Sequence, residues 1–296
     1  MAKPKIAPPK KVDVAQAASQ VELPGIKWKV VGTIVAGFAA LWVVALMATQ
    51  SVGYWGVGIV GGLTLGALGV GLYVWRMIGK QREILDLMKG AGDEEGRRRA
   101  IEQLGAAGSK DAMKALAHAQ LLAQEDPQKA IEALEAIDIE KAPALAQDEV
   151  RCQRAMMYLF MNRPKDARPL ADDIKIDRQP EPKAKAKYVA VVAEAFARTG
   201  KADEAKKLLQ EYKADDPRWG AEVGPLLYRA QVYTFMETKN RGLAKRALDA
   251  LIQIEPNMLS PFLQKGANPE LQKLALAALS DAGLAPRAQM KMRQKL

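Results

Sequence analysis

The sequence predicts an all-α protein in which a two-helix transmembrane hairpin is followed by an array of helical repeats. Two observations lead to this prediction. Residues 30–48 and 52–75 each lack charged side chains, and about 20 apolar residues suffice for a helix to cross the hydrocarbon core of a bilayer. After residue 111 the chain becomes alanine-rich, charged on one helical face and periodic, which is typical of stacked helix pairs.

These patterns divide the chain of 296 residues into five parts. Between the hairpin and the repeats we expect a helix over 76–104, interrupted at Gly90–Gly92, with Asp93 capping its second segment. The N-terminal part is rich in proline and lysine, so it is predicted to be mostly disordered. The parts are a basic tail (1–26), the hairpin (27–78), a juxtamembrane helical linker (79–110), the repeats (111–283) and a basic C-terminal tail (284–296).

The distribution of charge predicts the orientation in the membrane. The formal net charge is +10, of which +4 lies in residues 1–29, +2 in 76–110, +4 after residue 283 and none in 111–283. A nucleic-acid surface would need its positive charge on the folded domain, so nucleic acid is not an expected partner. Lysine and arginine next to both spans, and none in the loop between them, indicate that both termini face the cytoplasm. We therefore expect a two-pass protein of a bacterial inner membrane.

Small residues form rows along both predicted spans. Gly58, Gly62 and Gly66 recur every four residues, and so do Ala36 and Ala40 in the first span. Such rows let helix backbones approach closely in lipid. Two interpretations stay open: the rows pack the hairpin on itself, or they also join copies of the chain into a homo-oligomer. Neither span has an ionisable residue, so a pore is disfavoured.

Four repeating units follow in the C-terminal half. Each has an alanine at the start of its second apolar run, and these alanines are 37, 38 and 39 residues apart: Ala130, Ala167, Ala205 and Ala244. Nine residues before each alanine is a large apolar residue: Leu121, Tyr158, Phe196 and Phe235. Twelve or thirteen residues after each alanine is a proline: Pro143, Pro180, Pro217 and Pro256.

These units resemble the tetratricopeptide repeat, and residues 185–217 are the best match, with Ala193, Phe196, Gly200 and Ala205 in the family's positions. The resemblance covers about half of the chain. It departs from the family pattern at His118 and Val232, where the family prefers glycine or alanine, and at Lys114 and Arg151, where it prefers large apolar residues.

The resemblance implies pairs of antiparallel helices stacked into an α-solenoid, which binds proteins and has no catalytic residues of its own. It also implies partner contacts on the concave side of each first helix. A groove with Arg198, Arg229 and Tyr233 would suit an acidic or aromatic segment. Carried over by position, the contact residues are Met156, Phe160, Lys187, Glu194, Arg198, Arg229, Tyr233 and Met236.

Enzymatic chemistry is not expected. His118 is the single histidine and Cys152 the single cysteine, so neither a histidine-based metal cluster nor a disulfide within the chain is possible. No cofactor, no metal and no phosphate-binding motif are predicted. Two functions follow. The first is a membrane-anchored scaffold that docks or assembles partner proteins at the cytoplasmic face. The alternative is that the glycine-rich hairpin is the functional part, an oligomerising or complex-embedded membrane subunit supported by the repeats.

Overall fold

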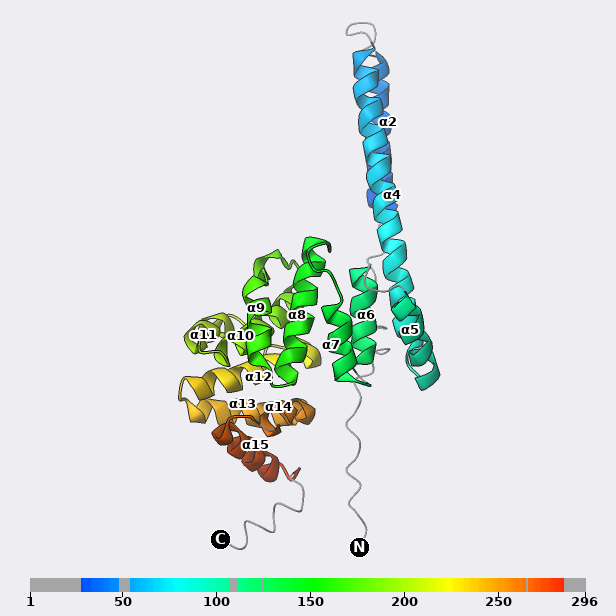
Figure 1. Ribbon diagram of the computed structural model, residues 1–296. Helices are drawn as coiled ribbons and strands as arrows, with labels where there is room; N and C mark the ends of the chain where they lie inside the picture. Colours follow the sequence, from blue (N-terminus) through cyan, green and yellow to red (C-terminus); the bar gives the residue numbers. More distant parts are fainter. Residues whose placement is uncertain (1–27, 48–53, 107–110, 124, 265, 285–296) are drawn as a thin grey trace, which may run out of the picture. The chain divides into compact units, whose positions relative to one another are not determined.

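The computed structural model describes residues 28–47, 54–106, 111–123, 125–264 and 266–284. Every regular element among them is a helix (Figure 1), so the predicted all-α class is confirmed for this part of the chain. The two basic tails and the loop between the predicted spans lie outside the described residues, apart from Leu284. The described residues divide into two compact units, 28–103 and 104–284, and each is described by itself.

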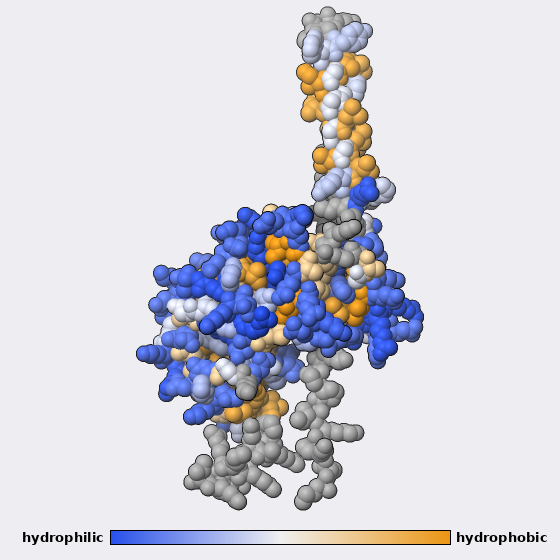
Figure 2. All heavy atoms as spheres, viewed as in Figure 1, coloured by the Kyte–Doolittle hydropathy of each residue, from blue (hydrophilic) through white to orange (hydrophobic). Residues whose placement is uncertain are grey.

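The first unit contains two long helices, α2 (Trp28–Met47) and α4 (Trp55–Gly90), and the beginning of α5 (Glu94–Ala106). α4 carries the one described stretch that is long and apolar enough to cross a membrane, Trp55–Tyr73. The apolar stretch of α2, Gly32–Met47, is shorter than a span requires. Two membrane-spanning helices were expected. Among the described residues, only α4 has the length and the apolar composition that a span needs. Hydrophobic side chains cover the outside of both helices (Figure 2).

α2 and α4 pack through a face that differs from the predicted one. The indole Nε1 of Trp42 donates a hydrogen bond to Thr64 Oγ1 at 3.1 Å, and Thr64 Oγ1 donates to Val60 O at 2.7 Å. Ala45 and Val60 are buried beside them. The predicted rows lie elsewhere: a Cβ added at Gly58, Gly62 or Gly66 would meet no atom within 4 Å, and Ala36 and Ala40 are exposed. The rows therefore do not pack this helix pair on itself.

The linker forms as predicted around its interruption. α4 runs without a break to Gly90, and Asp93 Oδ1 accepts a hydrogen bond from the Gly96 amide at 2.7 Å, which caps the start of α5. The bend is tight, because a Cβ on Gly96 would overlap the carbonyl oxygen of Gly90. Glycine at position 96 is thus required by the close approach of two backbone segments.

The second unit consists of successive helix pairs. α10 packs against the two helices on either side of it in the sequence, and α12 packs against α10, α11 and α13. The pairs are α6 (Ala112–Leu122) with α7 (Pro127–Glu135), α8 (Ala144–Phe160) with α9 (Pro164–Asp173), α10 (Pro182–Ala197) with α11 (Ala202–Gln210), and α12 (Gly220–Glu237) with α13 (Arg241–Ile254). A short 3-10 helix η2 (Ile176–Arg178) precedes α10, and η3 (Pro256–Leu259), α14 (Ser260–Leu263) and α15 (Pro269–Asp281) follow the last pair.

The repeat positions found in the sequence occupy equivalent places in these pairs. All four repeat alanines lie in second helices and are at most 1% exposed: Ala130, Ala167, Ala205 and Ala244. A residue with positive φ ends the first helix of three pairs, at Asn162, Gly200 and Lys239. Alanine lets the second helix approach its neighbours closely, and the left-handed turn reverses the chain. The four alanines therefore share one buried position in the second helices of four consecutive pairs.

Candidate functional site: a buried charge network across three helix pairs

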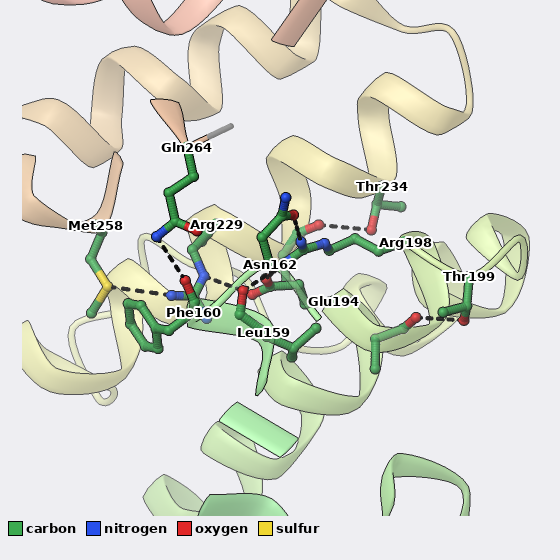
Figure 3. A network of polar contacts seen from close by, with 12 residues as sticks. Leu159, Phe160, Asn162, Glu194, Arg198, Thr199, Arg229, Thr234, Met258 and Gln264 are labelled. Carbon is green, nitrogen blue, oxygen red and sulfur yellow. Dashed lines mark hydrogen bonds and ion pairs between the residues drawn. The ribbon is translucent and has the colours of Figure 1, made fainter. Parts of the chain in front are cut away.

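Four of the predicted partner-contact residues lie around one carboxylate, that of Glu194 (Figure 3): Phe160, Glu194, Arg198 and Arg229. Glu194, from the middle of α10, accepts a hydrogen bond from Arg229 Nε at 2.7 Å on one oxygen and from Arg198 Nη1 at 3.0 Å on the other. Arg229 comes from α12, and Arg198 directly follows the last residue of α10. One acidic side chain therefore pairs with two arginines.

Each arginine reaches a further helix. Arg198 donates to the carbonyl oxygen of Leu159 at 2.8 Å and to the side-chain oxygen of Asn162, both at the end of α8. The guanidinium carbon of Arg229 lies 3.9 Å from the centre of the Phe160 ring. These contacts join α8, α10 and α12 through their facing sides.

The network is almost fully removed from solvent. The side chains of Glu194 and Arg229 are each 1% exposed, and that of Arg198 is 5% exposed. Charges buried this deeply are tolerated only when they are paired and hydrogen-bonded. The guanidinium carbon of Arg198 lies 4.4 Å from the centre of the Tyr233 ring. Burial raises the pKa of the Tyr233 hydroxyl. Tyr233 therefore stays neutral beneath the arginine at physiological pH.

The segment after the last helix pair closes this site. The side-chain amide of Gln264 donates to the carbonyl oxygen of Phe160 at 3.1 Å. Phe262 is fully buried, with its ring centre 4.9 Å from that of Tyr233. Arg229 Nη1 donates to the sulfur of Met258 at 3.8 Å. η3 and α14 thus cover the side of α8 and α12 on which the network lies.

Another predicted contact residue, Lys187, lies nearer the start of α10 and pairs with Glu149 of α8. Lys187 Nζ is 2.6 Å from Glu149 Oε1, and the Tyr188 hydroxyl donates to the other oxygen of Glu149 at 3.1 Å. Burial opposes the ionisation of Glu149, but Lys187, Gln153 and Tyr188 outweigh it and hold its pKa below the usual value. The Glu149–Lys187 pair is therefore ionised at physiological pH.

The remaining predicted residues are Met156, which is half-buried against the core, and Met236, which is 8% exposed. None of the eight residues is exposed. The predicted residues are thus packed between helix pairs, with Lys187 in a different ion pair from the Glu194 network. A binding role for it stays a prediction.

Ion pairs connect consecutive first helices, and two of them have the spacing of the repeat. Glu149 of α8 pairs with Lys187 of α10, 38 residues later, and Lys183 of α10 pairs with Glu222 of α12 at 2.7 Å. Glu194 and Arg229 are 35 residues apart. Charged residues that the resemblance assigns to a partner therefore also connect each pair to the next.

Sequence reasoning missed two components. Asn162 is not among the predicted contact residues, whereas its positive φ of 58° follows the end of α8 and its side chain binds Arg198. The covering segment was missed because Pro256 is the proline of the fourth repeating unit, and no groove contact is predicted beyond it. Its signal was the apolar sequence Met258–Leu263, which is too short for a repeat helix yet contains a phenylalanine.

The described residues contain no group of three or more His, Cys, Asp or Glu side chains arranged to hold a metal ion. Cys152 is fully buried, and burial raises the pKa of its thiol to about 12. His118 packs against Gly105, where an added Cβ would lie 3.2 Å from the imidazole Nε2. A thiol that stays protonated is not a nucleophile, so Cys152 acts as a core residue.

No protein-family model, no curated protein and no solved structure matches this chain. The class is therefore taken from the structure: in the part that it describes, the protein is all-α, with one clear membrane-span candidate and a body of consecutive helix pairs.

Proposed function

We propose that this protein is a membrane-anchored, tetratricopeptide-like scaffold that docks partner proteins at the cytoplasmic face of a bacterial inner membrane. The observation that carries the proposal is the equivalence of the four helix pairs, with one buried alanine at the same place in each second helix. Stacked helix pairs of this kind provide extended binding surfaces and no catalytic centre.

The membrane part of the proposal rests on α4 and its neighbour. Large apolar side chains of α4 are highly exposed in the isolated chain, such as Leu65 at 72% and Leu68 at 65%. A contiguous apolar surface of this size needs a lipid or protein environment. We propose that α2 is the other crossing. Trp42 donates to Thr64 across the pair and Thr64 donates to the Val60 carbonyl, so both polar groups have the partners that a bilayer interior requires.

Chemical crosslinking in native membranes, followed by mass spectrometry, tests the docking function. Docking predicts crosslinks from residues 111–283 to one or a few other proteins. These crosslinks should be lost when the lysines on the first helices are replaced. Crosslinks confined to other copies of α2 and α4 would contradict docking.

One observation favours the alternative function, in which the glycine-rich helices are the active part. Gly58, Gly62 and Gly66 form an open row that the α2–α4 pair leaves uncovered. Small residues on an open face are what close helix association in lipid requires. We propose contacts between copies of the chain as their role in this alternative.

Gly62→Leu tests the alternative, and Gly71→Leu is its matched control. Gly71 lies nine residues further along α4, about half a turn away at 100° per residue, and its Cβ position is also open. Loss of the oligomer in Gly62→Leu alone, measured by native mass spectrometry from detergent, supports the alternative. An oligomeric state that neither substitution changes argues against it.

A further inference from the structure

The segment Pro256–Gln264 lies on the helix face where the proposed function places partner contacts. It is built from two very short helices, η3 and α14, of four residues each. Its anchors are Met258, Phe262 and Gln264, whose contacts are to Arg229, Tyr233 and the Phe160 carbonyl, respectively. A chain segment of about nine residues therefore makes the kind of contacts that a bound peptide would make.

The site beneath this segment does not depend on the segment for its polar contacts. Glu194 already binds both arginines, and Arg198 has two further acceptors on α8. When the segment leaves, Arg229 loses one weak contact to sulfur but keeps its carboxylate. No charge becomes unpaired, so the groove over α8, α10 and α12 can stay formed without its cover.

The groove is also incompletely filled. A cavity of about 160 Å³ lies at its edge, between the end of α8 and the start of α15. Asn162, Arg198, Tyr233 and Met236 line it together with Asn268. Gly266, which has a φ of 90°, lies between the segment and α15. The cavity borders the groove residues Arg198 and Tyr233 and not the segment itself, and Gly266 gives the chain a left-handed turn between the segment and α15.

We propose that Pro256–Gln264 is an internal ligand that occupies the partner groove and competes with partner segments for it. This inference rests on the proposed docking function and adds its regulation. It also specifies the chemistry of the partner. Because both arginines are already neutralised, the groove selects a short apolar segment with an aromatic ring for Tyr233 and an amide donor for the Phe160 carbonyl. An acidic segment gains little there, in contrast to the expectation from sequence.

The test uses the full chain in detergent micelles and a fluorescein-labelled synthetic peptide of residues 255–265. Fluorescence anisotropy compares the native chain with Phe262→Ala/Gln264→Ala, in which the internal segment has lost two anchors. The double variant should bind the peptide at least tenfold more tightly than the native chain. A peptide carrying Ala in place of Phe262 should bind neither protein. Equal binding of the normal peptide to both proteins would overturn the proposal.

Hydrogen exchange keeps the test decisive if the double variant is destabilised. In the native chain, amides of 256–264 should exchange faster than those of α10 and α12, because the segment opens while the groove stays formed. Gln264→Ala alone, which removes one hydrogen bond, should increase that difference. If 256–264 exchanges only together with α10 and α12, the segment is a fixed part of the core and the proposal fails.

The two proposals can fail separately. The peptide is the chain's own sequence, so its binding does not depend on any partner. Absence of partner crosslinks in native membranes would refute docking and leave the peptide result unaffected. If the native chain and the double variant hold the same partners equally, the segment does not control docking.

Discussion

The buried network makes a quantitative prediction about which charge matters most. Glu194 pairs with two arginines, whereas each arginine keeps another acceptor or ring contact when the other is removed. Glu194→Gln leaves two guanidinium groups without a carboxylate in a site that is at most 5% exposed. Removing one partner of a buried pair costs about 3–5 kcal/mol, and we expect this variant at the upper end.

Arg229→Met should cost less, at the lower end of that range, about 3 kcal/mol or below. Glu194 keeps Arg198 in this variant, and the methionine fills much of the vacated volume. Lys183→Met is the matched control, since it breaks another ion pair between α10 and α12. The side chains of that pair are 42% and 52% exposed, so we expect a change of at most about 1 kcal/mol.

Hydrogen exchange of the full chain in micelles, measured at increasing urea, follows α10 and α12 directly and yields the free energy of unfolding of each variant. The order of destabilisation should be Glu194→Gln, then Arg229→Met, then Lys183→Met. If Glu194→Gln is no worse than the control, the network is open to water. The predicted groove would then be accessible without movement of the covering segment.

Three further predictions concern single positions. Gly96→Ala should loosen the bend between α4 and α5, because its Cβ overlaps the Gly90 carbonyl; faster amide exchange at 91–97 checks this, and unchanged exchange would refute the close approach. Cys152 should not react with a thiol reagent at pH 8 until urea unfolds the chain, because burial raises its pKa to about 12; rapid reaction of the native protein would contradict its burial. Burial lowers the pKa of His118 from its ordinary value of 6.5, so the unfolded chain binds the imidazole proton more tightly than the folded chain does. The stability of α6 should therefore fall as the pH drops below about 6.5. Amide exchange at pH 5.5 and 7.5 measures this change, and His118→Gln should abolish it.

Much of the helix-pair architecture could be predicted from the sequence, because it depends on short-range features. A small residue at a fixed offset marks each close helix contact, which is why Ala130 and Ala244 are both buried. Side-chain caps are equally local: Asp126 and Asn268 each accept hydrogen bonds from the first turn of the following helix. The end of α4 at Gly90 could be predicted because Gly90 and Gly92 disfavour a helix and Asp93 can cap the next one.

The site could be predicted only as a set of residues. A charged residue on a first helix can face solvent or a partner about 35 residues away, and local sequence does not distinguish these cases. Glu194 and Arg229 are such a pair. The packing face of α4 was missed for a related reason, since Gly62 satisfies the small-residue pattern but Thr64 and Val60 meet α2. In both cases, contacts between residues far apart in the sequence determine which side chains are buried.

The most direct test of the docking function is site-specific photocrosslinking in living cells. A photoreactive amino acid is placed at position 237, an exposed residue at the end of the first helix α12 beside Arg198 and Tyr233, or at position 207, an exposed lysine of the second helix α11. Docking through the first helices predicts adducts with a defined partner protein from position 237 and few or none from position 207. Equal adducts from both positions, or none from 237 in chains confirmed to be in the membrane, would contradict a scaffold that docks partners through its first helices.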